Sequence, residues 1–232
     1  MTSNGVNPSK RCRFAENLIS WHLTNNASFP WREEKDPYKI LVSEILLRKT
    51  TRKQVKEIFP HFFQVYPSFS ALADAHLVEI DEVIRPLGME HRRARLLKEL
   101  ASQIVSERGG VVPTTEEDLL ALPGVGRYVA NAVLCFAGGK DAPLVDTNVI
   151  RVIQRVFSFK AKRKRVRSDP EVWEFVSSLI PLGKGKEFNL AILDFAAAVC
   201  TSRSPKCGSC PNNTMCDYYA GKEKSEDGRR FL

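Results

Sequence analysis

The sequence predicts an all-α protein, and three observations support this prediction. Apolar residues recur at helical spacing through most of the 232 residues. No stretch shows the alternating apolar pattern of strands joined by hairpin turn signals. Hydrophobic residues make up 43% of the chain, which is enough for a real core at this length and excludes a disordered protein.

The helices are expected in the following order. Residues 10–26 form an amphipathic stretch, which Phe29-Pro30-Trp31 ends. Residues 37–49 begin with a proline, which is favourable in the first turn of a helix, and place Glu44 among apolar neighbours. Further helices are predicted around residues 55–63 and at 68–75, 79–84, 90–107, 115–121, 127–138, 147–157, 170–179 and 187–199. Thr114 and Glu117 fit a capping box that opens the helix at 115–121.

The charge balance favours a polyanionic partner. Lys and Arg outnumber Asp and Glu by 35 to 27, giving a net charge of +8 and a pI of about 9.2. Residues 160–167 hold six basic side chains among eight, and they read equally well as a solvated loop or as a phosphate contact. The Arg-Arg-Ala-Arg run at 92–95 has the same two readings.

No apolar run is long enough for a membrane span, and the N-terminal residues do not resemble a signal peptide. We therefore expect a soluble, intracellular protein, which in a prokaryote would be located in the cytoplasm or nucleoid.

Four of the six cysteines are crowded between positions 200 and 216 and predict a metal site. Cys200, Cys207, Cys210 and Cys216 are separated by six, two and five residues. Zinc sites usually show two close pairs with a longer stretch between them. The spacing here better suits four thiolates around an iron–sulfur cluster, although zinc also remains open at this point. Cys12 and Cys135 stand alone and read as ordinary thiols.

Two short segments could carry chemistry, one by binding a phosphate and the other by placing a carboxylate. Leu122-Pro123-Gly124-Val125-Gly126 lies between two predicted helices, and its glycines allow a tight turn that leaves amides uncovered for a phosphate. A plain turn between helices is the alternative. Asp146 precedes the helix at 147–157 and is well placed as its N-cap. A carboxylate fixed at that position could also stabilise a sugar cation.

Glu44 and Tyr128 are further candidates whose roles the residues alone leave open. Glu44 either faces solvent on an amphipathic helix or faces a pocket, where burial would raise its pKa and let it donate a proton near neutrality. Tyr128 follows the glycine turn and would ordinarily be a core or rim aromatic.

Taken together, these motifs resemble the helix-hairpin-helix DNA glycosylases that carry an iron–sulfur cluster. The Leu-Pro-Gly-Val-Gly turn, the Val-Asp-Thr-Asn segment that contains Asp146 and the four-cysteine loop carry the resemblance, which spans roughly residues 14–220. The resemblance implies a [4Fe-4S] cluster. It also implies that duplex DNA is bound and that one nucleotide is flipped out so that its N-glycosidic bond can be hydrolysed.

The resemblance also implies two helical domains with a DNA cleft between them. A six-helix barrel that contains the helix-hairpin-helix motif is expected at residues 30–139. Residues 1–29 and 140–221 are expected to form the iron–sulfur cluster domain. The low complexity of the last residues separately predicts a flexible tail at 222–232.

The residue roles implied by the resemblance transfer one position at a time. Asp146, which stands 22 residues after Gly124, matches the essential carboxylate that steadies the oxocarbenium-like sugar and helps water attack. Glu44 matches the acid that adenine-DNA glycosylases use on the purine ring. Tyr128 stands where the endonuclease III branch carries the lysine that forms a Schiff base. Tyrosine cannot form that adduct, so we expect a monofunctional glycosylase with absent or weak lyase activity.

Other residues are expected at the DNA. Arg48 or Lys49, at the end of the Glu44 helix, would enter or flank the gap left by the flipped base. The remaining expected contacts come from the turn residues Leu122, Gly124, Val125 and Gly126, from Asn148, and from Arg203 and Lys206 of the cysteine loop.

The base removed is expected to be thymine or uracil opposite guanine. Residues 44–51, Tyr128 and the Phe-Asn-Leu and Leu-Asp-Phe segments at 188–195 resemble the thymine-DNA mismatch branch, in which Tyr and Asp face the flipped pyrimidine. Adenine opposite guanine or 8-oxoguanine is the alternative. Residues 48–51 lack the paired glutamines and residues 88–91 lack the aromatic pair of adenine enzymes, and no 8-oxoguanine-reading domain follows Cys216.

A non-catalytic module that recognises mismatches for a partner is a second alternative, although the presence of both Glu44 and Asp146 argues against it. We expect a monomer that binds double-stranded DNA containing a mismatched or damaged base, associates with no membrane, and passes its product to an abasic-site endonuclease.

Overall fold

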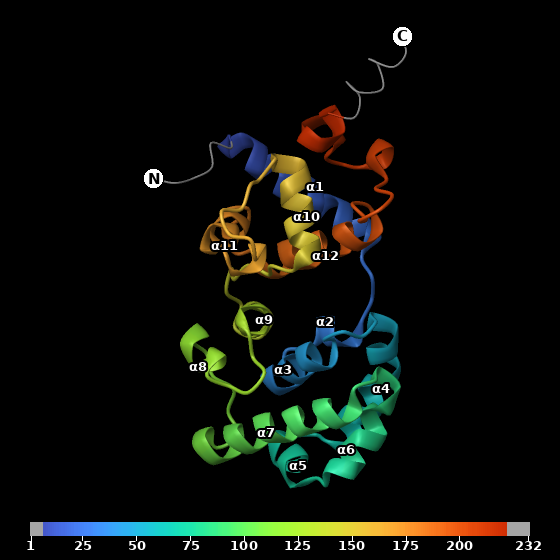
Figure 1. The fold of residues 1–232 in the computed structure, drawn as a ribbon, viewed down its shortest axis with the longest axis vertical. Coiled ribbons are helices and arrows are strands. Elements are labelled where there is room, and N and C mark those ends of the chain that lie inside the picture. The colour runs from blue at the N-terminus through green and yellow to red at the C-terminus, as the bar shows by residue number, and fades with distance from the viewer. Residues whose placement is uncertain (1–6, 222–232) are drawn as a thin grey trace. The chain divides into compact units, whose positions relative to one another are not determined.

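The computed structural model describes residues 7–221, and within that range the secondary structure is helical with no β-strand (Figure 1). This confirms the expected all-α fold class for the described part of the chain. The expected tail at 222–232 lies outside the described residues. None of the described helices is long and apolar enough to cross a membrane.

The chain divides into two compact units. Unit 1 combines the chain up to Ala27 with the chain from Asp141 onward, and unit 2 consists of Ser28–Lys140. Unit 1 contains α1 (Pro8–Asn25), α10 (Thr147–Phe157), α11 (Pro170–Ser177) and α12 (Gly185–Ala198), with 3-10 turns η2 (Val166–Ser168), η3 (Cys207–Ser209) and η4 (Asn213–Met215). Unit 2 contains α2 (Pro30–Glu33), α3 (Pro37–Leu46), α4 (Arg52–Val65), α5 (Phe69–Asp74), α6 (Leu77–Ile84), η1 (Arg85–Leu87), α7 (Glu90–Arg108), α8 (Glu116–Leu120) and α9 (Arg127–Phe136).

The core of unit 2 forms around α3, a mostly apolar helix that is buried on nearly every side. Leu41, Ile45 and Leu46 are fully buried, and α3 packs against α9 and α7. Helices α5 and α6 pack on the other side of α7, so that the long amphipathic helix lies between two layers of shorter ones. A helix that is apolar all round is stable only inside such a core, which explains why α3 occupies this place.

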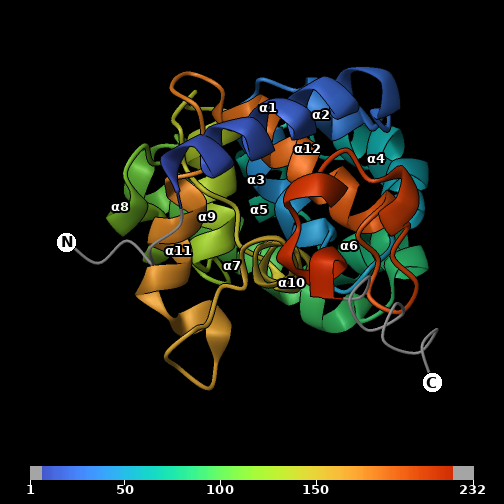
Figure 2. The same ribbon diagram turned by 90° about the horizontal axis from the view of Figure 1, so that it is seen from above.

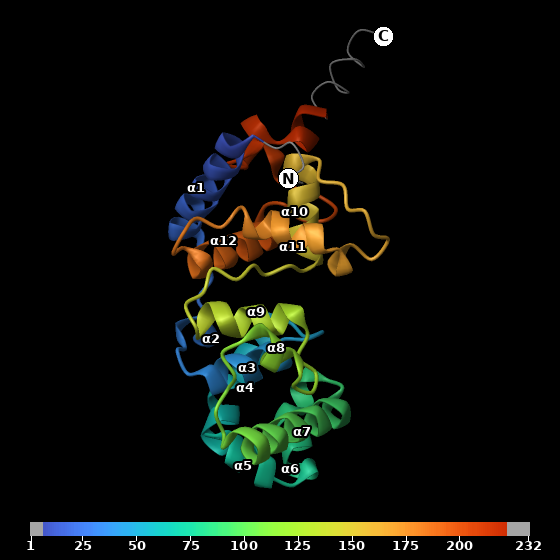
Figure 3. The same ribbon diagram turned by 90° about the vertical axis from the view of Figure 1, so that its left-hand side faces the viewer.

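Unit 1 packs its helices around α12. Helix α1 lies along α12, and α10 contacts α12 as well, as Figures 2 and 3 show. Phe14 of α1 meets Phe157 of α10 edge-to-face at 5.0 Å between ring centroids, and Phe157 meets Phe175 of α11 at 5.3 Å. These aromatic contacts join α1, from the start of the chain, to the consecutive helices α10 and α11.

Several expected helix ends differ from the observed ones by one to three residues, and two of the differences have a clear physical reason. The helix expected at 37–49 ends at Leu46, and Lys49 adopts a left-handed conformation with φ of 54°, which a continuous helix cannot include. The cap of α8 is Thr115, whose hydroxyl accepts the backbone N–H of Asp118, in place of the expected pair Thr114 and Glu117. The shift by one residue places three acidic side chains in the first turn of α8, where the helix dipole favours them.

Candidate functional site

Asp146 is the N-cap of α10 in unit 1. Its Oδ1 accepts the backbone N–H of Asn148 at 2.8 Å and that of Val149 at 2.7 Å, and its Oδ2 accepts the side-chain amide of Asn148 at 2.7 Å. The side chain is half-buried. Both carboxylate oxygens are therefore held in fixed directions at the positive end of a helix, and Oδ2 keeps room for a further donor.

The Asp146 carboxylate is connected to the cysteine loop through two side chains. Arg151, one turn along α10, donates from Nη1 to the Oδ1 of Asn148 at 2.9 Å. The same guanidinium donates from Nε to the backbone carbonyl of Cys200 and from Nη2 to that of Ala196, each at 2.9 Å. The amide of Asn148, expected at the DNA, thus joins Asp146 to Arg151, and Arg151 is a residue that the sequence pattern did not indicate.

Glu44 lies in α3 of unit 2 and is buried, with 8% of its surface exposed. No described residue forms a hydrogen bond or ion pair with its carboxylate. Burial without a compensating partner raises the pKa of Glu44 from 4.5 to about 7. Of the two readings of Glu44, the structure therefore favours a protonatable group in an apolar setting over a solvent-facing helix residue.

Tyr128 is half-buried near the start of α9, the helix that packs against α3. Both candidate side chains of unit 2, Glu44 and Tyr128, are thus carried by helices that contact each other. Asp146 and Asn148 belong to unit 1, where each is positioned by contacts inside that unit.

The glycine turn joins α8 to α9 and buries its apolar side chains. Leu122 and Val125 are 3% and 7% exposed, and the N–H of Val125 donates to the carbonyl of Leu122 within the turn. Gly124 has a φ of 71°, and a Cβ at this position would lie 2.6 Å from the side chain of Leu96. Among the described residues, no acceptor faces the backbone N–H of Gly124 or Gly126, so the turn can offer these amides to an anion.

Arg48 and Lys49 are exposed in the loop that follows α3. The Nη1 of Arg48 donates to the carbonyl of Gly124 at 2.9 Å, which ties this loop to the glycine turn. Lys49 holds its left-handed conformation next to that bond. A non-glycine residue in this region costs energy, and such strain often occurs at binding sites.

A buried arginine of α7 supports the same loop. Arg93 donates to the backbone carbonyls of Ile45 at 2.7 Å, Leu46 at 3.2 Å and Arg48 at 3.0 Å. Burial lowers the pKa of the Arg93 guanidinium, and the neighbouring charge of Arg48 adds to the effect. The sequence alone did not decide whether the basic run at 92–95 is a solvated helix face or a phosphate contact. Within this run, Arg93 does neither and instead caps the end of α3.

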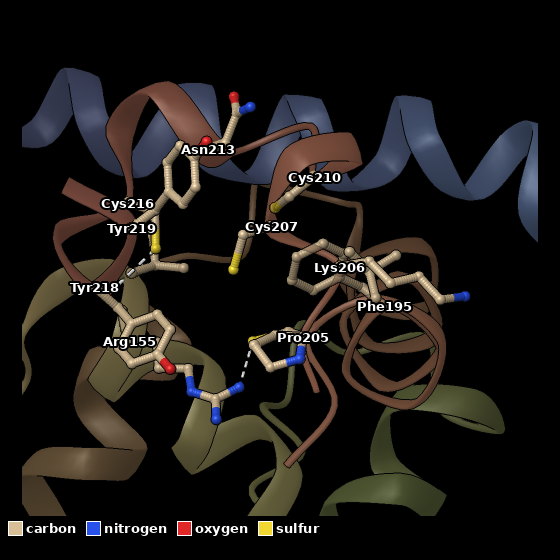
Figure 4. Close-up of a pocket in the computed structure, with 13 residues that line it drawn as sticks. Arg155, Phe195, Pro205, Lys206, Cys207, Cys210, Asn213, Cys216, Tyr218 and Tyr219 are labelled. Atoms are coloured by element: carbon tan, nitrogen blue, oxygen red, sulfur yellow. Dashed lines mark hydrogen bonds between the residues drawn. The ribbon is translucent and has the colours of Figure 1, made fainter. Parts of the chain in front are cut away.

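The four crowded cysteines line one cavity in unit 1. Its empty volume is about 330 Å³, part of it open to solvent, and its wall includes Arg155, Tyr218 and all four thiols. Figure 4 shows the sulfur atoms of Cys207, Cys210 and Cys216 turned toward the same space. Arg155 donates from Nη1 to the Sγ of Cys200 at 3.5 Å and places its guanidinium over the ring of Tyr218.

The four thiols that line this cavity are of the donor type that both zinc ions and iron–sulfur clusters take. Within the described residues, no three His, Cys, Asp or Glu side chains converge closely enough to hold one ion. In a [4Fe-4S] cluster each of four thiolates binds a different iron, so the sulfurs stand apart around a shared cavity. Arg203 and Lys206 of the same loop are exposed.

The helical fold and the glycine turn between α8 and α9 place the chain in a class of DNA repair proteins. Residues 42–177 match the family described as HhH-GPD superfamily base excision DNA repair protein. The chain belongs to this superfamily.

Several curated relatives cover nearly the whole chain. It is 47% identical to the thymine/uracil-DNA glycosylase of Pyrobaculum aerophilum, over 91% of this chain and 94% of that protein. It is 44% identical to the thymine-DNA glycosylase of Aeropyrum pernix, over 87% and 92% respectively. The adenine DNA glycosylase of Mycobacterium tuberculosis is 38% identical, over 90% of this chain and 69% of that protein.

Solved structures agree with the fold. The structure of a thermostable thymine-DNA glycosylase superposes with a TM-score of 0.88 at 40% identity, covering 92% of this chain and 98% of the other. A trapped endonuclease III–DNA covalent intermediate superposes with a TM-score of 0.81 at 24% identity, covering 94% and 99%, which supports the fold.

Proposed function

We propose that this protein is a monofunctional DNA glycosylase that removes thymine or uracil opposite guanine by hydrolysing the N-glycosidic bond of a flipped nucleotide. The observation that carries the proposal is the fixed, half-buried carboxylate of Asp146, in a chain that is 40–47% identical to named thymine and thymine/uracil-DNA glycosylases. Unit 2 corresponds to the six-helix barrel and unit 1 to the cluster domain in this proposal.

Asp146 supplies the negative charge that the reaction needs. As the bond between sugar and base lengthens, the sugar becomes positively charged. A carboxylate attracts this transition state more than the neutral ground state, which is the condition for catalysis. Because both oxygens of Asp146 are already held by N–H donors, the side chain reorganises little during the reaction. Asn148 acts here as a positioning residue for Asp146, and a water activated beside Oδ2 is the attacking group.

Glu44 assists departure of the base. With a pKa of about 7, it is partly protonated at neutral pH and can donate a hydrogen bond or a proton to the pyrimidine as negative charge develops on the ring. Tyr128 packs on the extruded base. Because position 128 carries no amine, no Schiff base forms there with the sugar and strand cleavage by that route is absent.

The remaining contacts hold the duplex. The free amides of Gly124 and Gly126 bind a phosphate. Lys49 and Arg48, on the loop tied to that turn, flank the gap left by the flipped base. Arg203 and Lys206 of the cysteine loop contact the DNA backbone. We propose a monomer whose abasic product passes to a separate endonuclease.

Cys200, Cys207, Cys210 and Cys216 would hold a [4Fe-4S] cluster, which when bound supplies a rigid cross-link among the irregular residues that follow α12. Hydrogen bonds among the chain's own residues connect the cysteine loop to Asp146 and so restrict its movement. Arg151 joins the carbonyl of Cys200 to Asn148, and Asn148 holds Asp146.

A panel of duplexes tests the proposed activity. Duplexes that contain G·T, G·U, A·8-oxoguanine, A·G or an oxidised pyrimidine are incubated with the protein and resolved with and without alkali. We expect product from G·T and G·U, and only after alkali treatment, since the protein leaves an intact strand with an abasic site. Preferred cleavage of the adenine duplexes would identify an adenine glycosylase. Strand breaks without alkali would contradict the monofunctional assignment. Binding of the duplexes without base release would identify a mismatch-binding module.

A further inference from the structure

Residues 160–167 form a loop, here called the basic arm, whose charge the proposed function leaves unexplained. The arm carries six Lys and Arg side chains, all exposed, and no acidic residue. The whole chain has a net charge of +8, so this short segment supplies most of the imbalance. Mutual repulsion among cations held this close destabilises the folded protein unless an external counter-charge offsets it.

A buried carboxylate shapes the arm. Asp169 is 2% exposed and accepts the backbone N–H groups of Lys162 at 2.7 Å, Arg163 at 3.0 Å and Glu171 at 3.2 Å. Burial raises the pKa of Asp169, but these hydrogen bonds lower it by more, so the carboxylate is ionised. Trp173 adds a bond from its indole N–H to the carbonyl of Arg167 at 2.9 Å. The arm therefore has a defined backbone conformation although its sequence resembles a disordered basic run.

The arm projects from unit 1 beside α10. Ser158 ends α10 in a left-handed conformation with φ of 51°, which turns the chain away from the helix axis. Figures 2 and 3 show the segment between α10 and α11 looping out to the side of the unit. It returns through η2, which contacts α10. Helix α10 has 11 residues and is therefore about 16 Å long, so the arm leaves the helix roughly 16 Å from the end that Asp146 caps.

Most of these cations have no acidic partner. Lys162 forms an ion pair with Glu171, and Arg163 donates to the carbonyl of Ser168 at 3.0 Å. Among the described residues, no carboxylate lies within ion-pair distance of the other four basic side chains of the arm, Lys160, Lys164, Arg165 and Arg167. Their charge is available to a partner outside the chain.

We propose that the basic arm is a second DNA-binding element, which contacts the phosphates of the duplex that flanks the flipped nucleotide. The proposal rests on the proposed function, because the partner is the same duplex. Successive phosphates of one strand advance about 3.4 Å along the axis of the duplex, so a set of cations that starts roughly 16 Å from Asp146 meets phosphates several nucleotides away from the reacting sugar. The arm thus adds affinity and salt dependence without reading sequence.

The test measures binding to an undamaged duplex as a function of salt. The arm variant combines Lys160→Gln, Lys164→Gln and Arg165→Gln, whose side chains make no hydrogen bond or ion pair within the described residues. The control variant combines Arg13→Gln, Lys35→Gln and Lys56→Gln, which removes the same charge from exposed positions on other elements. Fluorescence anisotropy gives the dissociation constant of each protein at several salt concentrations.

The slope of log affinity against log salt should become flatter by about 0.9 for each lost phosphate contact, hence by about 2 to 3 in the arm variant. The control variant should keep the slope of the parent protein. An unchanged slope in the arm variant, or an equal change in the control, overturns the proposal. The same titration with polyglutamate tests for an acidic protein partner. If the arm variant loses affinity for polyglutamate while its duplex binding is unchanged, the proposal is overturned and the arm binds an acidic protein instead.

A measurement of base release distinguishes a failure of the arm proposal from a failure of the proposed glycosylase function. With a saturating amount of enzyme, the arm variant should release base from G·T and G·U duplexes at the rate of the parent protein, since the arm lies away from the reacting sugar. A slower rate at saturation overturns the assignment of the arm to flanking DNA. Absence of base release from the parent protein contradicts the proposed function, while the salt dependence with undamaged duplex still tests the arm.

Discussion

The carboxylate of Asp146 both caps α10 and, in the proposed reaction, faces the sugar, and one substitution separates these roles. Asparagine is as good an N-cap as aspartate, so Asp146→Asn should keep the fold and leave duplex affinity within a few fold. It removes the negative charge, so base release in a single turnover should be abolished. Loss of duplex binding or a large drop in melting temperature would instead indicate that Asp146 serves mainly as a cap.

The burial of Glu44 predicts an unusual dependence of stability on pH. The pKa of Glu44 is about 7 in the folded protein, against 4.5 without burial. At pH 4 the carboxyl is mostly protonated in both states, so burying it carries little charge penalty. As the pH rises from 4.5 to about 7, the unfolded state releases its proton first, and the free energy of unfolding falls by up to about 3 kcal/mol.

Glu44→Gln removes this titration. The variant should be more stable than the parent protein at pH 8 and equally stable at pH 4, as measured by denaturant unfolding at both values. Glu99→Gln, which changes an exposed glutamate on α7, serves as the matched control and should show no such difference. Equal stability of Glu44→Gln and the parent at pH 8 would contradict an uncompensated buried carboxyl.

The same pKa predicts the pH profile of catalysis. If Glu44 donates a proton or hydrogen bond to the leaving base, the rate of base release should fall as the pH rises through about 7, because the protonated form is lost. In Glu44→Gln, the rate should be lower and this decline should disappear. A decline that persists in the variant would assign the titration to another group.

At the scale of elements, the end of α3 depends on a residue from another helix. Arg93 satisfies three carbonyls at the point where α3 stops and the Arg48–Lys49 loop begins. Arg93→Met keeps the length of the side chain but removes its hydrogen bonds to these carbonyls. The Leu46 carbonyl still accepts the Thr50 hydroxyl at 2.8 Å and the Ile45 carbonyl the Arg48 N–H at 3.4 Å, so the loss should cost about 1–2 kcal/mol of stability. The same change should weaken duplex binding, because Lys49 loses its support.

Thermal unfolding and duplex binding check the role of Arg93. Arg95→Met provides the control, since Arg95 is exposed on the same helix and makes no hydrogen bond or ion pair within the described residues. If Arg93→Met and Arg95→Met have the same melting temperature, the carbonyls at the end of α3 do not need the guanidinium.

At the scale of the whole molecule, the sequence predicted the features that depend on neighbouring residues, namely the order of the helices and the N-cap of α10. The order of the helices follows from apolar spacing, and Asp146 as an N-cap follows from its place before a periodic segment. The supporting roles of Arg93 and Arg151 were not recognised, because they depend on long-range contacts that no local pattern contains. Arg93 meets a carbonyl 48 residues away in the chain, and Arg151 meets one 49 residues away.

Disruption of the cysteine cavity should make unit 1 more flexible. The reason is that Arg151 and Arg155 of α10 both donate hydrogen bonds to groups of the cysteine loop. Cys210→Ser should remove the visible absorption and the iron and sulfide content expected of a cluster. Hydrogen exchange should then accelerate in residues 200–216 and at the start of α10, while α3 in unit 2 stays protected. Cys12→Ser, at an exposed thiol, is the control and should change neither readout. Zinc in the purified parent protein, with no iron, would contradict the cluster and return the site to the zinc alternative.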